Sequence, residues 1–523
     1  MLSNRPLISA LLFGTFPVAF YLLDFINYSR AGKLLITGMA TIGLLSALAS
    51  KYHSPLLRWI LLFVSLVLFA NLSFHAGMRD IFGVAQDEMM VMKSILSTNT
   101  QESYEFWLQY KPYLIKHLLI FVFSFILFYL LALKPNTKKQ HISINTAVLS
   151  FWILFFIVAH LEKSIRRGNP FVYFPHFYNE YRQELTELKQ LDHLLQSNQT
   201  NSTLSGVRYY GKDSKNTVVW VIGESSTRHN WSLYGYGRKT TPLIDSIKSE
   251  LLVFDHILAA APITIPAFER MLTPATKANP ELWKKEPSIL QIAKKAGYHT
   301  YWISNHTTDA HNGITTIFAQ QADETYITNK GKARGEGSFD ASVLPAYQKA
   351  LQDPYDKKLI LVHLLGSHPA YNFRYPDNYA KFTGNFDDEV AKNLKKEGRA
   401  EWAIAFRNFY DNSVLYGDYI RYTLLKRLQQ SPEAVHAVWI YHPDHGEDVC
   451  HHTNFSGHNK HAIEQWEIPL LLWSSIKMKS NTKREYRLDE IESTMLGLLK
   501  ISSKYYHPDQ DILIKNSTTH GTN

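Results

Sequence analysis

Apolar residues are distributed so unevenly that they divide the chain into two parts. Up to about residue 160 the sequence consists of long apolar runs separated by short polar stretches, and beyond that point it alternates as globular sequences do. A membrane-spanning helix needs about 20 consecutive apolar residues. Five runs approach that length, and together they predict an all-α bundle of five transmembrane helices: 6–23, 34–50, 56–73, 117–133 and 145–160.

Basic residues near the ends of these runs indicate which side of the membrane each loop faces, because cytoplasmic loops carry an excess of Lys and Arg. The N-terminus and the loops after the second and fourth runs contain Arg5, Lys51, Arg58, Lys134, Lys138 and Lys139. An odd number of spans then places everything after residue 160 outside the cytoplasm. The opposite side also carries basic residues, so the asymmetry is modest: Arg30, Lys33, Lys163, Arg166 and Arg167.

Two polar segments accompany the bundle. The stretch 74–113 is long for a loop between spans and mixes acidic, methionine and aromatic residues, which predicts a short amphipathic helix on the membrane surface. The stretch 161–205 is charged at first and then rich in Gln, Asn and Ser. We expect it to form a surface helix followed by a linker.

From residue 206 onward, short buried-type runs alternate with helical patterns. Helix-like stretches cover 286–296, 340–352 and 410–429. Strands separated by helices predict an α/β domain, over 206–516, in which helices sandwich a mainly parallel sheet. The candidate strands are 217–223, 300–304, 359–365, 435–441 and 469–473.

The cysteine count and the net charge add two points to this picture. The single cysteine, Cys450, excludes an intrachain disulfide, so an exported domain would depend on its own core or on a metal. The net charge of +9 suits a surface beside anionic lipid. The sequence contains no nucleic-acid-binding motif, and we expect no nucleic-acid partner.

Acids and histidines follow several of the predicted strands. In open α/β sheets, ligands bind beyond the carboxyl ends of the strands. Glu224 follows the first strand, His368 the third, and Asp444 and His445 the fourth. Two carboxylates and an imidazole with an open position are typical of a catalytic zinc or manganese site, although such a turn can also be a surface loop with capping carboxylates.

A nucleophile can be sought near the predicted helix start at 261–269. Thr264 lies at or near the first turn, with Pro266 two residues later. It can serve simply as the helix cap. A helix N-terminus also favours a phosphate or an alkoxide beside it, so the position leaves both roles open.

Four motifs, in the same order, resemble those of the phosphoethanolamine transferases of the sulfatase and alkaline-phosphatase superfamily. The resemblance covers nearly the whole chain and implies five spans followed by a catalytic domain. The motifs are 218–228 continuing through 232–242, then 363–369 with 374–376, then 411–419, and finally 444–447, with His458 at the place of a last site histidine.

The resemblance implies roles for individual residues. It implies a zinc ion, with manganese less favoured, held by Glu224, Thr264, Asp444 and His445, and it leaves a second metal possible. Thr264 would be the nucleophile, and His368 and His458 would bind phosphate, hold that second metal or protonate a leaving oxygen. Substrate contacts are expected from Ser94, Thr98, Glu102, Glu269, His363 and Glu447; Thr98 and Glu102 match a Thr-x-x-x-Glu pattern, although Glu102 also fits a solvated acidic helix.

The surroundings of Thr264 depart from one branch of this family. Colistin-resistance-type members carry cysteines around the nucleophile, whereas residues 259–266 contain none. The Pro-x-Thr-Ile element at 262–265 looks like the branch that modifies the lipopolysaccharide core. The departure therefore favours core sugars over lipid A as the acceptor.

The resemblance implies a two-step transfer from phosphatidylethanolamine to lipopolysaccharide, at a core heptose or lipid A, through a phospho-threonine intermediate. The protein would be a multi-pass bacterial inner-membrane monomer with its catalytic domain in the periplasm. The alternatives are a phosphoglycerol transferase or another phosphodiesterase of the superfamily, and a non-catalytic membrane sensor or scaffold. A sulfatase would need a Cys/Ser-x-Pro-x-Arg element, which is absent around Thr264.

Overall fold

A computed structural model shows that the chain forms two compact units. The first contains residues 1–98 and 106–186, and the second contains 99–105 and 187–523. The residues that the structure describes are 5–82, 100–133, 145–197, 204–306, 313–329, 339–384 and 388–514.

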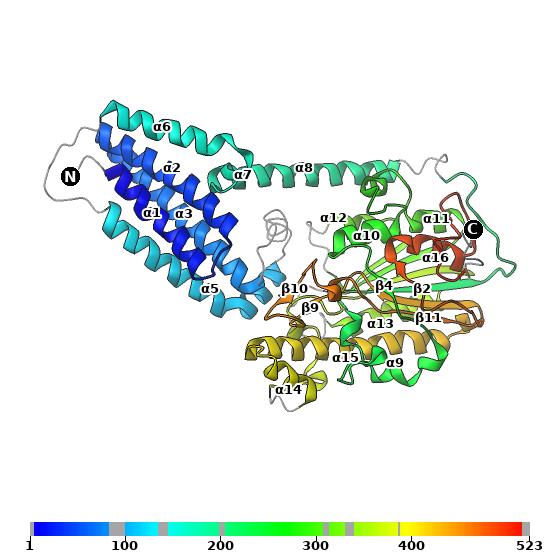
Figure 1. Ribbon diagram of the computed structural model, residues 1–523. Helices are drawn as coiled ribbons and strands as arrows, with labels where there is room; N and C mark the ends of the chain where they lie inside the picture. The colour runs from blue at the N-terminus through cyan, green and yellow to red at the C-terminus, as the bar shows by residue number, and fades with distance from the viewer. Residues whose placement is uncertain are drawn as a thin grey trace, which may run out of the picture. The chain divides into compact units, whose positions relative to one another are not determined.

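Apolar helices make up the first unit (Figure 1). α2 (Tyr28–Tyr52) is long and apolar enough to cross a membrane, as are Pro55–Asp80 within α3 (Pro55–Phe82) and the stretch Tyr110–Leu133. That last stretch joins α5 (Thr100–Phe128) to the π-helical η1 (Tyr129–Leu133). α1 (Arg5–Leu22) and α6 (Thr146–Leu161) are apolar but shorter. Length and composition thus support three of the five expected spans, and the count of five stays a prediction.

Glycines let the helices of this unit pack closely. A Cβ atom on Gly38 of α2 would lie 2.0 Å from the ring of Phe13 on α1, and one on Gly43 would lie 2.0 Å from Trp152 on α6. Small residues at helix interfaces are how membrane helices bring their backbones together. α2 is therefore the central helix that α1 and α6 both contact.

The polar segments differ from their predicted limits. Residues 74–82 continue α3 and residues 100–113 already belong to α5, so helices occupy both ends of the expected loop. The predicted surface helix of that loop, with Ser94 and Thr98, falls outside the described residues, and of Glu102 only its place in α5 is described. The expected helix after residue 160 is present as α7 (Lys163–Arg166) and α8 (Pro170–Ser197).

A seven-stranded sheet forms the centre of the second unit, in the order β3-β11-β8-β2-β7-β5-β6. Five neighbouring strands, β8, β2, β7, β5 and β6, run parallel, whereas β11 pairs antiparallel with both β8 and β3. All five predicted strands are present. The bounds are β2 Asn216–Gly223, β3 Leu252–Phe254, β5 His299–Ser304, β6 Glu324–Ile327, β7 Lys357–His363, β8 Ala437–Pro443 and β11 Leu470–Ser474.

Alternate side chains of β2 pack into two different cores. Val218, Trp220 and Ile222 belong to one buried cluster, and Val219 and Val221 belong to the other. Figure 1 shows helices on both faces of the sheet. The predicted sandwich is therefore confirmed: one face carries α10 (Thr264–Leu272), α11 (Ile289–Lys295) and α16 (Ile491–Leu498), and the other carries α9 (Pro242–Ser246), α13 (Leu344–Gln352) and α15 (Glu401–Gln429).

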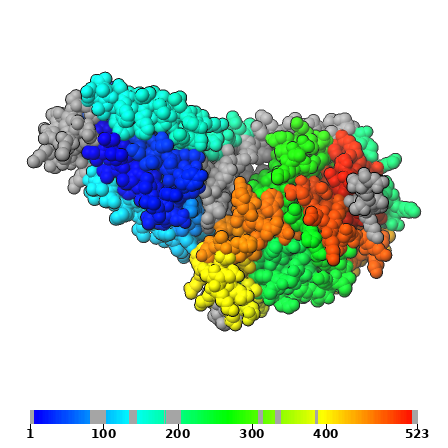
Figure 2. All heavy atoms as spheres, in the orientation of Figure 1, coloured from blue at the N-terminus to red at the C-terminus, as the bar shows by residue number. Residues whose placement is uncertain are grey.

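Segments far apart in the sequence lie side by side in this second unit. β4 (Ile257–Leu258) pairs parallel with β12 (Tyr486–Arg487), more than 200 positions later. Figure 2 shows more generally that atoms from the middle of the sequence, coloured green, adjoin atoms from its last part, coloured orange to red. The last part of the chain therefore completes the layer that carries α10.

The register of the three central strands brings their carboxyl ends together. Ile222 of β2 pairs with His363 of β7, and Gly223 pairs with Pro443 of β8. The residues that follow, including Glu224 and Asp444, therefore emerge at the same edge of the sheet, where ligands bind in open α/β folds.

Candidate active site

Four predicted site residues meet at this edge of the sheet. Glu224 follows β2, Asp444 and His445 follow β8, and Thr264 begins α10. The Thr264 Oγ1 lies 3.2 Å from Glu224 Oε1 and 3.4 Å from His445 Nε2. The same His445 nitrogen lies 3.4 Å from Glu224 Oε1 and 3.4 Å from Asp444 Oδ2. The sequence thus predicted a cluster that the fold assembles from three separate segments.

The hydrogen bonds of His445 and Asp444 direct one potential ligand atom of each residue into this cluster. His445 Nδ1 lies 2.7 Å from the carbonyl oxygen of Gly446, which holds a proton on Nδ1 and makes Nε2 the nitrogen that a metal ion would bind once its proton is displaced. Asp444 Oδ1 accepts from two backbone N–H groups, whereas the buried Oδ2 has no hydrogen-bond partner in the described part of the chain. This donor set fits a zinc ion.

The protonation of the cluster also indicates a site for a cation. Burial and the neighbouring Glu224 raise the pKa of Asp444 to about 8. Burial opposes the charged form of His445, but Asp444 and Glu224 raise its pKa to about 10. Burial would raise the pKa of Glu224 too, yet its hydrogen bond with His445 holds it well below the usual value. A divalent cation would replace these protons.

Strained backbone holds Glu224 in place. Ser225 adopts a left-handed φ of 53°, unusual for a residue with a side chain, while its Oγ donates to Glu224 Oε1 at 3.0 Å. Gly366 has a φ of 55°, and a Cβ there would lie 2.8 Å from the backbone of Glu224. The loop after β7 therefore packs directly against Glu224, and only glycine fits at this position.

Thr264 is the first residue of α10 and not its cap. Ile263 occupies the N-cap position without a side-chain hydrogen bond, and the Thr264 hydroxyl instead lies within hydrogen-bond distance of Glu224 and His445. Of the two roles that the sequence left open, the geometry therefore supports the chemical one.

Glu447 and His458 form a pair next to this cluster. His458 Nδ1 lies 2.9 Å from Glu447 Oε2, and Tyr371 donates to Glu447 Oε1 at 2.9 Å. The rings of His458 and His445 lie 4.9 Å apart. Glu447 is fully buried, and its position supports a role in orienting His458. The direct substrate contact expected from the sequence stays a prediction.

His368 follows β7 as predicted. Burial lowers its pKa to about 3 even though Glu224 opposes the shift, so the ring is neutral and suited to binding more than to donating a proton. Glu269, also expected to contact substrate, lies half-buried on α10, five residues beyond Thr264.

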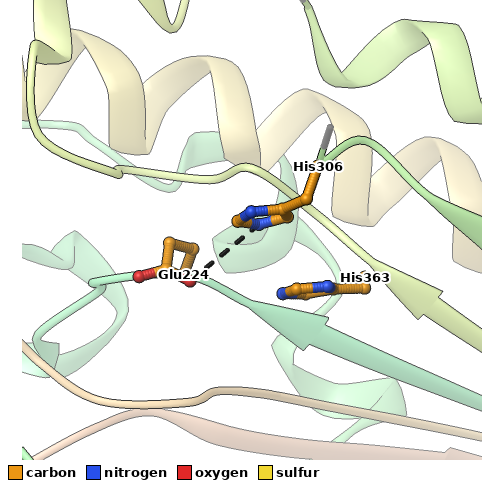
Figure 3. Close-up of side chains that lie close together, drawn as sticks. All are labelled: Glu224, His306 and His363. Carbon is orange, nitrogen blue, oxygen red and sulfur yellow. Dashed lines mark ion pairs between the residues drawn. The ribbon is translucent and has the colours of Figure 1, made fainter. Parts of the chain in front are cut away.

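His306, which was not among the residues predicted from sequence, lies beside the cluster (Figure 3). Its ring stacks on that of His363 with centroids 4.0 Å apart, and its Nε2 lies 3.9 Å from Glu224 Oε2. His306 comes two residues after β5, so the strand-end rule that identified Glu224 also points to it. His363 is buried and also packs against Phe268. Its expected contact with substrate stays a prediction.

Other motif residues build the fold around the site. Asp411 on α15 is fully buried and accepts from Asn230 at 2.6 Å, Tyr236 at 2.7 Å and Arg238 at 2.7 Å. Arg238 also reaches Asp388 at 2.7 Å. This network joins the segment after Glu224 to α15, so these residues stabilise the fold around the site.

The comparisons with known proteins agree with this geometry. The family model described as Sulfatase matches residues 216–501. Phosphoethanolamine transferase EptC of Escherichia coli is 33% identical over 78% of this chain and 70% of its own length. Phosphoethanolamine transferase CptA of Salmonella typhimurium is 31% identical with the same two coverages.

Solved structures share the fold. The zinc complex of the periplasmic domain of E. coli EptC, 33% identical, covers 60% of this chain and 91% of that domain with a TM-score of 0.55. The integral membrane lipooligosaccharide phosphoethanolamine transferase A of Neisseria meningitidis, 21% identical, covers 98% and 97% with a TM-score of 0.67. The chain therefore belongs to the phosphoethanolamine transferase family, whose catalytic domain is of the sulfatase type.

Proposed function

We propose that this protein transfers phosphoethanolamine from phosphatidylethanolamine to lipopolysaccharide, with Thr264 as the nucleophile. The observation that carries the proposal is the position of the Thr264 hydroxyl, at a helix N-terminus and 3.2 Å from a buried glutamate. Phosphoryl transfer depends chiefly on positioning the groups and offsetting charge on the phosphoryl oxygens, and this site contains the groups for both.

Glu224, Thr264, Asp444 and His445 would hold one zinc ion, with manganese the less favoured alternative. The unpartnered Asp444 oxygen and the direction of His445 Nε2 into the cluster support that assignment. When bound, zinc would lower the pKa of the Thr264 hydroxyl and offset negative charge on the phosphate.

The reaction divides into two displacements at phosphorus. First, Thr264 Oγ1 forms a bond to the phosphorus of the donor lipid, the bond to the diacylglycerol oxygen breaks, and that oxygen takes up a proton. Second, an acceptor oxygen attacks the same phosphorus and Thr264 regains its hydroxyl. His458, oriented by Glu447, can bind a phosphoryl oxygen or pass a proton, and neutral His368 can donate a hydrogen bond.

The helical unit would keep the catalytic unit beside its lipid substrates. We propose five spans in the bacterial inner membrane, with α1 and α6 crossing alongside the three longer apolar helices, and with the catalytic unit in the periplasm. We also propose that a single chain suffices, because all four proposed metal ligands come from one chain.

For the acceptor, we propose a core heptose ahead of lipid A. The cysteine-free surroundings of Thr264 support this choice, because they resemble those of the core-modifying branch. Mass spectrometry of lipopolysaccharide from cells with and without the protein would place the added group on the core or on lipid A.

A headgroup assay tests the donor. The purified full-length protein would be given phosphatidylethanolamine or phosphatidylglycerol labelled in the headgroup, with lipopolysaccharide as acceptor and the Thr264→Ala variant as control. We expect label to pass from phosphatidylethanolamine only, and only with the wild-type protein. Transfer from phosphatidylglycerol alone would instead establish a phosphoglycerol transferase.

A further inference from the structure

The two carboxylate oxygens of Glu224 have different neighbours. Oε1 lies 3.4 Å from His445 Nε2 and receives the Ser225 hydroxyl at 3.0 Å. Oε2 lies 3.9 Å from His306 Nε2, which belongs to a different segment of the chain. A carboxylate with an imidazole beside each oxygen is placed to bridge two ions.

His306 and His363 line the Oε2 side of this carboxylate. Their rings are stacked nearly parallel, 9° apart, with centroids 4.0 Å from each other. Figure 3 shows the outer nitrogen of His363 pointing toward the side occupied by Glu224. That nitrogen, Nε2, is buried and has no hydrogen-bond partner among the residues the structure describes, while Nδ1 lies 3.3 Å from the hydroxyl of Ser304.

An unpaired buried nitrogen costs free energy unless something binds to it. His363 is 1% exposed, so bulk water does not satisfy its Nε2. One ligand atom each from Glu224, His306 and His363 lies within 4.8 Å of the other two. Two imidazoles and a carboxylate form a usual donor set for zinc, with an open position for water or substrate.

We propose that Glu224, His306 and His363 form a second divalent-cation site, bridged to the first by the Glu224 carboxylate. The Leu364 carbonyl oxygen, 3.1 Å from His306 Nε2, would accept a hydrogen bond from the Nε2–H group while the site is ion-free. Once an ion replaces that proton, the same oxygen could serve as a further ligand. The inference rests on the first metal site of the proposed function.

Hydrogen bonds to Asp340 hold the two histidine-bearing segments of this site in place. Asp340 is buried and accepts a hydrogen bond from the side chain of Asn305 at 2.9 Å. Asn305 is the residue before His306. The same carboxylate accepts from the backbone N–H groups of Leu365 at 2.8 Å and Gly366 at 2.9 Å, which follow the strand carrying His363. Asp340 therefore positions both histidine-bearing segments, as outer partners of metal ligands do.

A second ion would let the site stabilise negative charge on two oxygens of the reaction instead of one. Paired ions in phosphoryl-transfer sites stabilise the attacking and the leaving oxygen separately. With Thr264 beside the first ion, the second would lie near an oxygen of the phosphoryl group or the leaving diacylglycerol. The ligand class is a divalent cation with nitrogen and oxygen preference, zinc first.

Metal counting tests this inference on the full-length protein in detergent. The protein would be stripped with a chelator, given a small excess of Zn²⁺, desalted and analysed for zinc per chain. We expect two ions for the wild type and one each for His306→Gln and His363→Gln. The matched control is His461→Gln, because this histidine is exposed, and it should retain two.

Asp444→Asn separates failure of the two sites. It removes a ligand of the first site alone, so we expect it to retain one ion, and its combination with His306→Gln to retain none. One ion in the wild type, unchanged in His306→Gln and lost in Asp444→Asn, would overturn the second site and leave the proposed function standing.

Cobalt gives a readout that needs no variant. The wild-type protein loaded with Co²⁺ should bind two ions whose electron spins are coupled through the shared carboxylate. Binding of a single ion, or of two ions that are magnetically independent, would contradict the bridged site even if both histidine variants failed to fold.

Discussion

The hydroxyl oxygen of Thr264 lies 3.2 Å from the nearer carboxylate oxygen of Glu224, although 40 positions separate the two residues. Their contact joins the end of β2 to the start of α10, and no local pattern in either segment requires it. It places the proposed nucleophile among the proposed metal ligands, at a helix end that favours a developing negative charge.

Replacement of Thr264 tests the nucleophile. We expect Thr264→Ala to abolish headgroup transfer, because the attacking oxygen is lost, with little change in the temperature of unfolding. Thr264→Ser keeps an oxygen at the same place and should retain measurable transfer. Full transfer by Thr264→Ala in a labelled-lipid assay would show that another group attacks phosphorus.

Zinc binding should weaken as pH falls. The pKa of Asp444 is raised to about 8 and that of His445 to about 10 in the ion-free cluster, so below pH 8 an entering ion must displace protons from both. Each displaced proton changes the apparent affinity about tenfold per pH unit. Competition with a chromophoric chelator from pH 6 to 8 measures this slope, and a pH-independent affinity would contradict the account.

Gly366→Ala should damage the site without unfolding the domain. The added Cβ would lie 2.8 Å from the Glu224 backbone, so we expect Glu224 to shift and zinc affinity to fall at least about tenfold, which corresponds to about 1.4 kcal/mol. Gly398→Ala is the matched control, because Gly398 also has a positive φ but no atom lies within 4 Å of the place its methyl group would take. Equal zinc affinities in the two variants would rule out the steric effect.

Asp411→Asn should be among the more destabilising changes in the catalytic unit. Removing its charge leaves the buried Arg238 guanidinium poorly neutralised, and breaking a buried pair costs about 3–5 kcal/mol. Asp388→Asn removes the charge of the partly exposed partner of the same arginine, and it should cost less than about 1 kcal/mol. Denaturant unfolding of both variants measures how much free energy of unfolding each one loses. Similar losses would contradict the structural role of Asp411.

The sheet was largely predictable from sequence because its central strands are fully buried. Every residue of β2 is buried, and such a continuous apolar run is typical of a parallel strand covered on both faces. β3 and β6 were missed because they are short edge strands with partly exposed residues. Their place in the sheet depends on neighbours far away in the sequence.

The site was predictable to the extent that its residues follow strands. Glu224, Asp444 and His445 were found in this way, whereas the stacking of His306 on His363 depends on the adjacency of β5 and β7. The burial of Glu447 could not be read from its turn either, since Tyr371 and His458 enclose it from other segments.

The most direct test of the central claim is peptide mass spectrometry of the full-length protein after incubation with phosphatidylethanolamine carrying an isotopic label in its ethanolamine. We expect a labelled phosphoethanolamine adduct on the peptide that contains Thr264, absent from Thr264→Ala and lost when lipopolysaccharide is added. An adduct on a different residue, or headgroup transfer with no adduct under single-turnover conditions, would contradict a threonine-linked intermediate.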